Sequence, residues 1–202
     1  SIWTEQHTQR DPSNWMCKAK EVGGGQFFSH GCHYIDLMLW MLGNPMKGIH
    51  LGTNRCTPWM EREGTSNVCL EFENGALGYH FGTWGARGTR LGYSFHAHCE
   101  KGMVEMQLEK GRVVYLGDVD KHVPGVHDPE QKEIILLEKK HAKPTEIEMS
   151  HFIKCIETGQ KPLTDAVSSF EGLKVIWELY NAEEKNIVAN LQGLGLGSTN
   201  FD

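Results

Sequence analysis

The side chains best suited to proton transfer lie close together near the beginning of the chain. Ser29, His33, Asp36 and Trp40 are spaced four, three and four residues apart. In a helix this spacing places all four along one face, because each residue turns the helix by about 100°. An imidazole oriented by a carboxylate one turn away can transfer a proton near neutral pH. The stripe therefore fits acid–base chemistry, or else a surface or core-edge histidine capped by Asp36.

Three consecutive glycines, residues 23–25, precede this stripe. Without side chains they would allow a ligand to approach the backbone N–H groups at the positive end of a helix. The same glycines could equally form a flexible hinge. The sequence leaves both alternatives open.

Metal and nucleophile chemistry have weaker support. His30 and His33 are one helical turn apart, and His96 and His98 share one side of a strand with Cys99 on the other. A zinc site needs a third protein ligand, and none stands at a recognisable spacing. Ser29 and the cysteines lack the sequence context of an activated nucleophile. We therefore expect no metal ion, with His96 and His98 on an interface or a solvated sheet face.

A helix must carry the stripe. Apolar residues recur every three or four positions, and Gly43 and Pro45 end the pattern, so we expect a helix of about 17 residues over 26–42; the apolar positions are Phe28, Cys32, Ile35, Met38, Leu39 and Leu42.

From residue 46 to about 140 the apolar period changes to two and short turns intervene, which predicts antiparallel strands. The strands are expected at 65–73, 76–85, 90–99, 103–108 and 112–116, followed by a mobile or substrate-facing loop at 122–129.

Two helices end the pattern. Thr145 with Glu148 forms a capping box for a helix that Gly159 ends, and a second helix covers about 165–185. Residues 187–191 look like a short closing strand. The fold class is thus α+β, an open, mostly antiparallel sheet with helices packed on one face. We expect an N-terminal arm at 1–22, this domain at 23–192 and a tail at 193–202.

Alternation along the strands divides the predicted sheet into two faces. One side carries apolar residues, namely Val68, Leu70, Phe72, Tyr79, Phe81, Leu91, Tyr93 and Phe95. The opposite side carries His80, Trp84, Ser94, His96 and His98. This second face is too aromatic for simple solvation, so we expect it to be open to a second copy and the protein to be a homo-oligomer.

Composition excludes several classes of protein. The 202 residues carry a net charge of −6 and their lysines are scattered, which argues against nucleic acid as a partner. No apolar run approaches the roughly 18 to 20 residues of a membrane span. The six cysteines form no C-x-x-C pair, and we expect them to be reduced. The absence of a leader fits a cytoplasmic protein or a chain that has lost its beginning.

Residues 23–36, Gly-Gly-Gly-Gln-Phe-Phe-Ser-His-Gly-Cys-His-Tyr-Ile-Asp, closely resemble a family signature. It opens the second domain of the glucose-fructose oxidoreductase and inositol dehydrogenase (Gfo/Idh/MocA) family. Trp15 before the glycines, residues 70–76 as a hairpin and residues 157–162 as a helix end extend the resemblance over nearly the whole chain. The segment from the glycines to His33 is the specific part.

The resemblance implies an NAD(P)-dependent dehydrogenase of sugars, polyols or related compounds. Members have a Rossmann domain first and an α/β substrate and oligomerisation domain second. Only the second is expected here, since no G-x-G-x-x-G motif stands between a strand and a helix and the family's Glu-Lys-Pro segment is missing. NAD or NADP would bind to the absent domain, and this chain alone should be inactive.

Site residues follow from the same resemblance. His33 matches the family's catalytic histidine, which moves the proton of the reacting hydroxyl. Many members have an aspartate where this chain has Ser29, so Asp36 or His30 would supply part of the relay, or the reaction is a variant or absent. Asp36 also matches a position that can be purely structural.

Two earlier residues would lie near a carbohydrate-like substrate, Trp15 and Lys18. Lys18 stands where the family often has an aspartate, which hints at an anionic substrate. The competing hypothesis is a stand-alone sugar-binding or scaffolding module without catalysis, and Ser29 is the residue that favours it.

Overall fold

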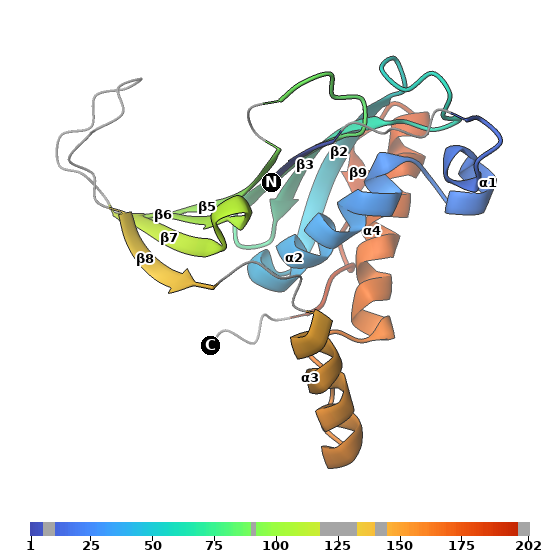
Figure 1. Cartoon of the computed structure of the whole chain (residues 1–202). Helices are drawn as coiled ribbons and strands as arrows, with labels where there is room; N and C mark the ends of the chain where they lie inside the picture. Colours follow the sequence, from blue (N-terminus) through green and yellow to red (C-terminus); the bar gives the residue numbers. More distant parts are fainter. Residues whose placement is uncertain (6–10, 90–91, 118–132, 140–144, 198–202) are drawn as a thin grey trace. The chain divides into compact units, whose positions relative to one another are not determined.

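The computed structural model describes residues 1–5, 11–89, 92–117, 133–139 and 145–197, and these form two compact units (Figure 1). The larger unit comprises Ile2–Gly92 and the chain from Gly159 onward, and the smaller one Tyr93–Thr158 with Ser1. Among the described residues, no helix has both the length and the apolar character needed to cross a bilayer.

The larger unit is built on a sheet with the strand order β1-β4-β3-β2-β9. The strands are β1 (Ile2–Thr4), β2 (Pro45–Thr53), β3 (Thr65–Phe72), β4 (Leu77–Thr83) and β9 (Ala189–Asn190). β1 runs parallel to β4, and the other pairings are antiparallel. β1 lies in the segment 1–22 that was expected to be irregular, which also contains a 3₁₀ turn, η1 (Trp15–Cys17), and a short helix, α1 (Ala19–Val22).

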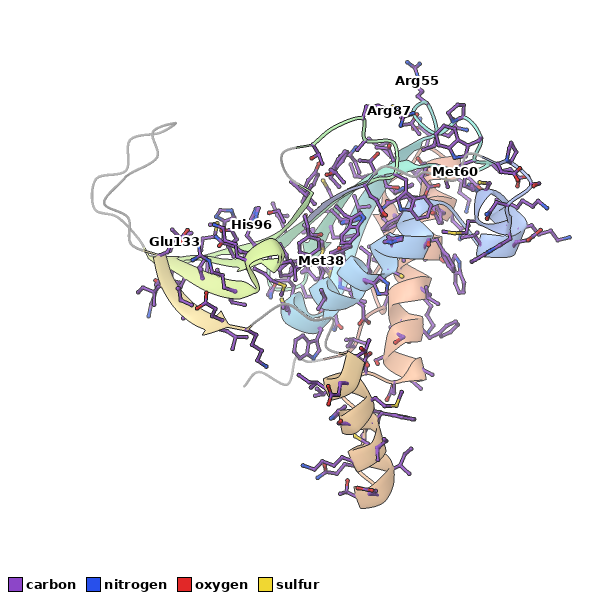
Figure 2. All side chains as sticks on the ribbon, viewed as in Figure 1. Met38, Arg55, Met60, Arg87, His96 and Glu133 are labelled. Atoms are coloured by element: carbon purple, nitrogen blue, oxygen red, sulfur yellow. The ribbon has the colours of Figure 1, made fainter. Side chains whose placement is uncertain are left out.

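Helices cover one face of this sheet. A π-helical turn, η2 (Phe27–Gly31), leads directly into α2 (Cys32–Leu42), and α4 (Ala166–Glu184) lies beside α2 (Figure 1). Together they bury the apolar side of β3, so Val68, Leu70 and Phe72 form one core with Ile35, Leu39, Val175, Ile176 and Leu179. Met38 of α2 points to the sheet (Figure 2), where Gly78 makes room for its sulfur.

The smaller unit contains an antiparallel meander. Its strands are β5 (Tyr93–Cys99), β6 (Gly102–Gln107), β7 (Arg112–Gly117) and β8 (Glu133–Glu138), with a 3₁₀ turn, η3 (Leu108–Lys110), before β7. The helix α3 (Thr145–Thr158) ends at Gly159, whose positive φ of 68° suits a helix stop. The α+β class, with a mostly antiparallel open sheet and helices on one face, is confirmed.

Helix boundaries follow the local signals closely. Asp165 caps α4 in a reciprocal box with Ser168, and Gly43 ends α2. The strand β1 was not predicted, and β2 and β8 lie within the region of about 46–140 predicted to form strands but outside the stretches named there. The loop expected at 122–129, the beginning of the strand expected at 90–99 and the end of the tail at 193–202 lie outside the described residues.

The assignment of His80 and Trp84 to an open sheet face is wrong. Both side chains are buried, 0% and 1% exposed, beneath the helices, whereas Tyr79 is exposed. His80 stacks on Tyr34 with ring centroids 4.7 Å apart. Its neighbours on the same face of β4, Gly78 and Gly82, leave space for the helical segment to approach. Alternation of residue types along a strand separates its two sides but does not tell which side the helices cover. Here the glycines identify the covered side.

Two buried glycines in helical segments give a matched test of this packing. A methyl group on Gly172 would lie 3.9 Å from Asp36, whereas one on Gly31 would lie 2.5 Å from Cδ2 of the buried Phe27 ring. Alanine in a helix interior is more stable than glycine by about 0.5–1 kcal/mol. We expect Gly172→Ala to be neutral or stabilising by up to about 1 kcal/mol and Gly31→Ala to be destabilising by about 1–3 kcal/mol.

Urea unfolding of both variants beside the wild-type chain measures the two free energies. Equal effects of the two substitutions would contradict the packing described for η2 and α2.

His80 gives a prediction about pH. Burial lowers the pKa of its imidazole to about 3 from the ordinary 6.5. The unfolded chain therefore takes up a proton below pH 6.5 that the folded chain refuses until about pH 3. Above pH 6.5 the buried imidazole does not change the free energy of unfolding. Below pH 6.5 it lowers that free energy by up to about 1.4 kcal/mol for each pH unit.

His80→Gln should flatten this dependence between about pH 6.5 and 4.5, whereas His98→Gln, at an exposed position, should not. Denaturant unfolding at a series of pH values checks it. An unchanged slope in His80→Gln would show that His80 is not held neutral by burial.

Candidate functional site

The first turn of the histidine-bearing segment is capped by residues distant in sequence. The main-chain carbonyl of Glu63 accepts from Gln26 N at 2.8 Å, and its carboxylate Oε1 accepts from Phe27 N at 3.1 Å. The hydroxyl of Tyr180 accepts from Gly25 N and from Phe28 N, each at 3.2 Å. Four consecutive N–H groups, which a helix normally leaves unsatisfied, are thus bound within the protein.

Glu63 and Tyr180 also bind each other. The Tyr180 hydroxyl donates to Glu63 Oε1 at 2.7 Å, and both side chains are buried. Burial, followed by the nearby Glu63 carboxylate, raises the pKa of Tyr180 well above its usual value. The phenol therefore stays protonated and keeps its donor role. We call this pair the Glu63–Tyr180 clamp.

The clamp explains the glycine triplet. Gly23 ends α1 with a φ of 93°, and a side chain on Gly24 would lie 2.9 Å from the Tyr180 hydroxyl. A side chain on Gly25 would overlap Glu63. Neither alternative drawn from the sequence describes these glycines, because Glu63 and Tyr180 occupy the N–H groups that a ligand would need and hold the segment that a hinge would need to move.

The π-turn then sets the position of the candidate residues. Single π-turns inside helices are rare and occur often at functional sites. Ser29 and His30 lie within η2 and are half-buried, and His33 follows on the first turn of α2, with its side chain exposed. His33 is thus presented to the outside by a segment whose start is fixed inside.

His30 is enclosed by aromatic rings. Its centroid lies 5.6 Å from that of Trp3 and 5.2 Å from that of Trp84, the latter edge-on. Burial lowers its pKa, and Nδ1 is buried with no hydrogen-bond partner in the described part of the chain. A neutral imidazole of this kind cannot lend charge to His33.

Asp36 lies one turn after His33. Burial raises the pKa of its carboxyl, and the imidazole of His33 acts in the opposite direction. Its Oδ1 also faces α4, where a side chain on Gly172 would lie 3.9 Å away. The carboxylate is therefore placed both to influence His33 and to fill the contact between α2 and α4.

Trp15 and Lys18 stand on the neighbouring segment. Trp15 is 59% exposed on η1, and Cys17 beside it packs in a cluster with Trp84, the ring that contacts His30. Lys18 pairs with Glu21 at 3.3 Å, with both side chains largely exposed. The structure thus brings η1 to the same region as η2 through Trp84.

Two further kinds of site, a metal cluster and a phosphate cradle at the glycines of 82–88, can be compared with the described residues. No group of three possible metal ligands occurs among them. In the glycine-rich segment 82–88, Gly82 packs under Gln26, and Gly85 abuts Cys56. Arg87 donates to the Cys56 carbonyl at 3.0 Å and lies over the Trp59 ring. Gly82 and Gly85 make room for side chains of the protein, whereas Gly88 has open space beside it, so the three glycines do not together form a phosphate cradle.

His96 and His98 lie in the smaller unit, on exposed positions of β5, with rings 5.1 Å apart. Ser94, expected beside them on an open face, is buried, and its hydroxyl lies 3.0 Å from His96 Nδ1. Burial lowers the pKa of His96, followed by the effect of His98.

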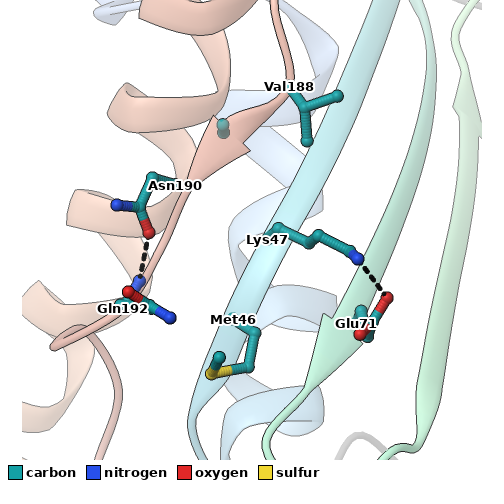
Figure 3. A pocket seen from close by; sticks show the side chains of 7 residues that line it. Met46, Lys47, Glu71, Val188, Asn190 and Gln192 are labelled. Carbon is teal, nitrogen blue, oxygen red and sulfur yellow. Dashed lines mark hydrogen bonds and ion pairs between the residues drawn. The ribbon is translucent and has the colours of Figure 1, made fainter.

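A shallow groove of about 440 Å³ lies elsewhere, between β2 and β9. Figure 3 shows its two polar contacts, the exposed ion pair of Lys47 with Glu71 at 2.9 Å and the hydrogen bond from Gln192 N to Asn190 at 3.2 Å. It contains none of the candidate residues.

Comparison with solved structures gives the same fold. A levoglucosan dehydrogenase in complex with NADH and levoglucosan superposes with a TM-score of 0.78 at 14% identity, covering 96% of this chain and 58% of that one. An aldose-aldose oxidoreductase from Caulobacter crescentus complexed with glycerol gives 0.71 at 18%, covering 94% and 54%. An NAD binding oxidoreductase from Klebsiella pneumoniae gives 0.75 at 14%, covering 94% and 57%.

The chain therefore spans little more than half the length of these solved chains. No curated protein sequence matches it. The family model described as the GFO/IDH/MocA C-terminal domain matches residues 1–105, which include β1, the clamp residue Glu63, the π-turn and His33. This match covers half of the chain. The chain therefore belongs to the GFO/IDH/MocA family and corresponds to its C-terminal domain.

Proposed function

We propose that this chain is the substrate and oligomerisation domain of an NAD(P)-dependent oxidoreductase that acts on a sugar, polyol or related hydroxy compound. The observation that carries the proposal is the placement of His33, an exposed imidazole on a helix whose start is fixed inside the protein. The family match supports it, as do relatives whose complexes hold NADH with levoglucosan or L-sorbose.

His33 would act as acid and base. In the oxidising direction its imidazole accepts the proton of the reacting hydroxyl, and in the reducing direction it returns that proton to the carbonyl oxygen. The nicotinamide that exchanges the hydride would belong to a cofactor domain outside this chain, which covers only 58% of the levoglucosan dehydrogenase that holds NADH. The 202-residue chain alone should then bind substrate without turning it over.

Asp36 is the better candidate for the relay that Ser29 cannot complete. It is the carboxylate whose pKa responds to His33, whereas burial keeps His30 neutral. We propose that Ser29, His30, Trp15 and Lys18 contribute to substrate binding. Lys18 is already paired with Glu21, so an anionic substrate would have to compete with that carboxylate.

His33→Ala tests the proposed role in the protein that carries this domain together with its cofactor domain. We expect kcat to fall by about 10²–10⁴-fold, the range typical of a lost general acid or base, with the fold intact. Turnover and circular dichroism measure the two effects. His98→Ala, also at an exposed histidine, is the control.

A folded His33→Ala protein with near-normal turnover would remove His33 from the mechanism. Substrate binding without any turnover in the wild type would favour the competing proposal, a sugar-binding or scaffolding module. The residue that favours that proposal is Ser29, which stands where many family members have an aspartate.

The open face of the larger sheet is the proposed interface between copies. Neighbouring strands place Ile49 beside Cys69 and Tyr79, and the next row places Leu51 beside Asn67 and Phe81. Leu51 is 62% exposed and Leu77, at the edge of the patch, is 79% exposed. Contiguous apolar surface of this kind commonly mediates association.

Leu51→Glu would place a charge in this patch. We expect the dissociation constant of the oligomer to rise by at least about tenfold, equivalent to about 1.4 kcal/mol. Leu163→Glu, at a position that is 75% exposed and outside the patch, is the control. Sedimentation equilibrium measures both, and an unchanged association of Leu51→Glu would place the interface elsewhere.

A further inference from the structure

The Glu63–Tyr180 clamp is unusual because it replaces local capping altogether. Helices commonly begin with a serine, threonine, aspartate or asparagine that accepts from the first turn. Here the residue before η2 is Gln26, which makes no side-chain cap. The acceptors come from residues about 36 and 152 positions away in sequence. The first turn is therefore capped only when the loop between β2 and β3, which carries Glu63, and the helix α4, which carries Tyr180, both pack against it.

The clamp itself has little freedom. The Tyr180 ring meets Phe27 at 5.7 Å and His50 at 5.1 Å, both edge-on, and Arg62 lies over its face at 5.6 Å. Its hydroxyl donates once and accepts twice, and Glu63 is 7% exposed. Because the Tyr180 hydroxyl takes part in three of these hydrogen bonds and Glu63 Oε1 in two, a small displacement would break several at once.

The effect of the clamp falls on the π-turn. Downstream, α2 is fixed by Ile35 and Leu39, which are fully buried in the core. Upstream, Glu63 and Tyr180 bind the backbone N–H groups of residues 25–28, while the Phe27 ring is buried in the core and stacks on His50. A π-turn contains one residue more than an α-turn, so its relaxation would rotate the upstream residues by about 100° relative to α2. Ser29 and His30 would then change direction while His33 would not.

We infer that Glu63 and Tyr180 are positioning residues that hold Ser29 and His30 in register with His33. This rests on the proposed function of His33. Both clamp side chains are buried, and the clamp acts through the N–H groups of Gly25, Gln26, Phe27 and Phe28.

The first test uses NMR of the 202-residue chain with Tyr180→Phe, which removes only the hydroxyl. We expect the contact between His30 and Trp84, upstream in the π-turn, to be lost or weakened. The contact between Tyr34 and His80, downstream in α2, should remain. Nuclear Overhauser effects between the ring protons report both. A merely structural role would leave both contacts intact or weaken both together.

The control is Tyr79→Phe, which removes an exposed hydroxyl bonded to Asn67 at 2.8 Å on the open face. It should leave both ring contacts unchanged. If Tyr180→Phe does not fold, Glu63→Asp replaces it, because the shorter carboxylate keeps the charge but withdraws from Phe27 N and the Tyr180 hydroxyl. Glu61→Gln is its control, since Glu61 accepts from Ala19 N at an exposed position. Both ring contacts intact in a folded Tyr180→Phe or Glu63→Asp chain would overturn the inference.

The second test measures turnover in the protein with its cofactor domain. Tyr180→Phe should lower kcat/KM for the substrate by at least about tenfold while the KM for the cofactor is unchanged. Glu63→Gln should restore much of what Glu63→Asp loses, because an amide oxygen can still accept from Phe27 N. His33→Ala is run in parallel.

The outcomes separate the two proposals. Loss of turnover in His33→Ala with wild-type kinetics in Tyr180→Phe overturns the positioning role alone. Wild-type turnover in His33→Ala overturns the proposed role of His33, whatever the clamp variants do, and the NMR contacts then still decide whether the clamp fixes the π-turn.

Discussion

The hydrogen bond between Tyr180 and Glu63, 2.7 Å long, is the interaction on which the arrangement of the candidate site depends. It joins the C-terminal half of α4 to the loop before β3 and brings two acceptors to the start of the histidine segment. Four backbone N–H groups are satisfied by this pair and by the Glu63 carbonyl. Without such partners, buried N–H groups at a helix start are costly, so the π-turn and its acceptors stabilise each other.

The glycines and the second contact of α4 complete this constraint. Gly24 and Gly25 let Tyr180 and Glu63 approach the backbone, and Gly172 lets Asp36 approach α4 two turns away from Tyr180. α4 therefore holds the histidine segment at both ends, while His33 remains exposed between them. A proton-transferring imidazole on such a segment can have a defined direction without being buried, and burial would disfavour its charged form.

Local sequence signals predicted the elements well but not their long-range contacts. Gly43 and Gly159 correctly marked the ends of two helices, and the glycine-to-His33 signature indicated the family, but the capping box of Asp165 with Ser168 was not predicted. The roles of Glu63 and Tyr180 were not predicted because their partners lie far away in sequence. An acidic residue between Arg62 and Gly64 is also typical of an exposed, solvated position. The side of His80 was misassigned because alternation is symmetric, and Gly78 and Gly82 beside it were the available signal. The strands β1 and β8 are too short or isolated to show a period.

The protein itself occupies the N–H groups at the start of the histidine segment. Amide hydrogen exchange of Gly25, Gln26, Phe27 and Phe28, followed by NMR in the 202-residue chain with and without inorganic phosphate, tests it most directly. The account predicts that all four amides are protected as strongly as those of β3 and do not respond to phosphate. Rapid exchange of these amides, or shifts on addition of phosphate, would contradict it and would return the glycine triplet to the role of a ligand site.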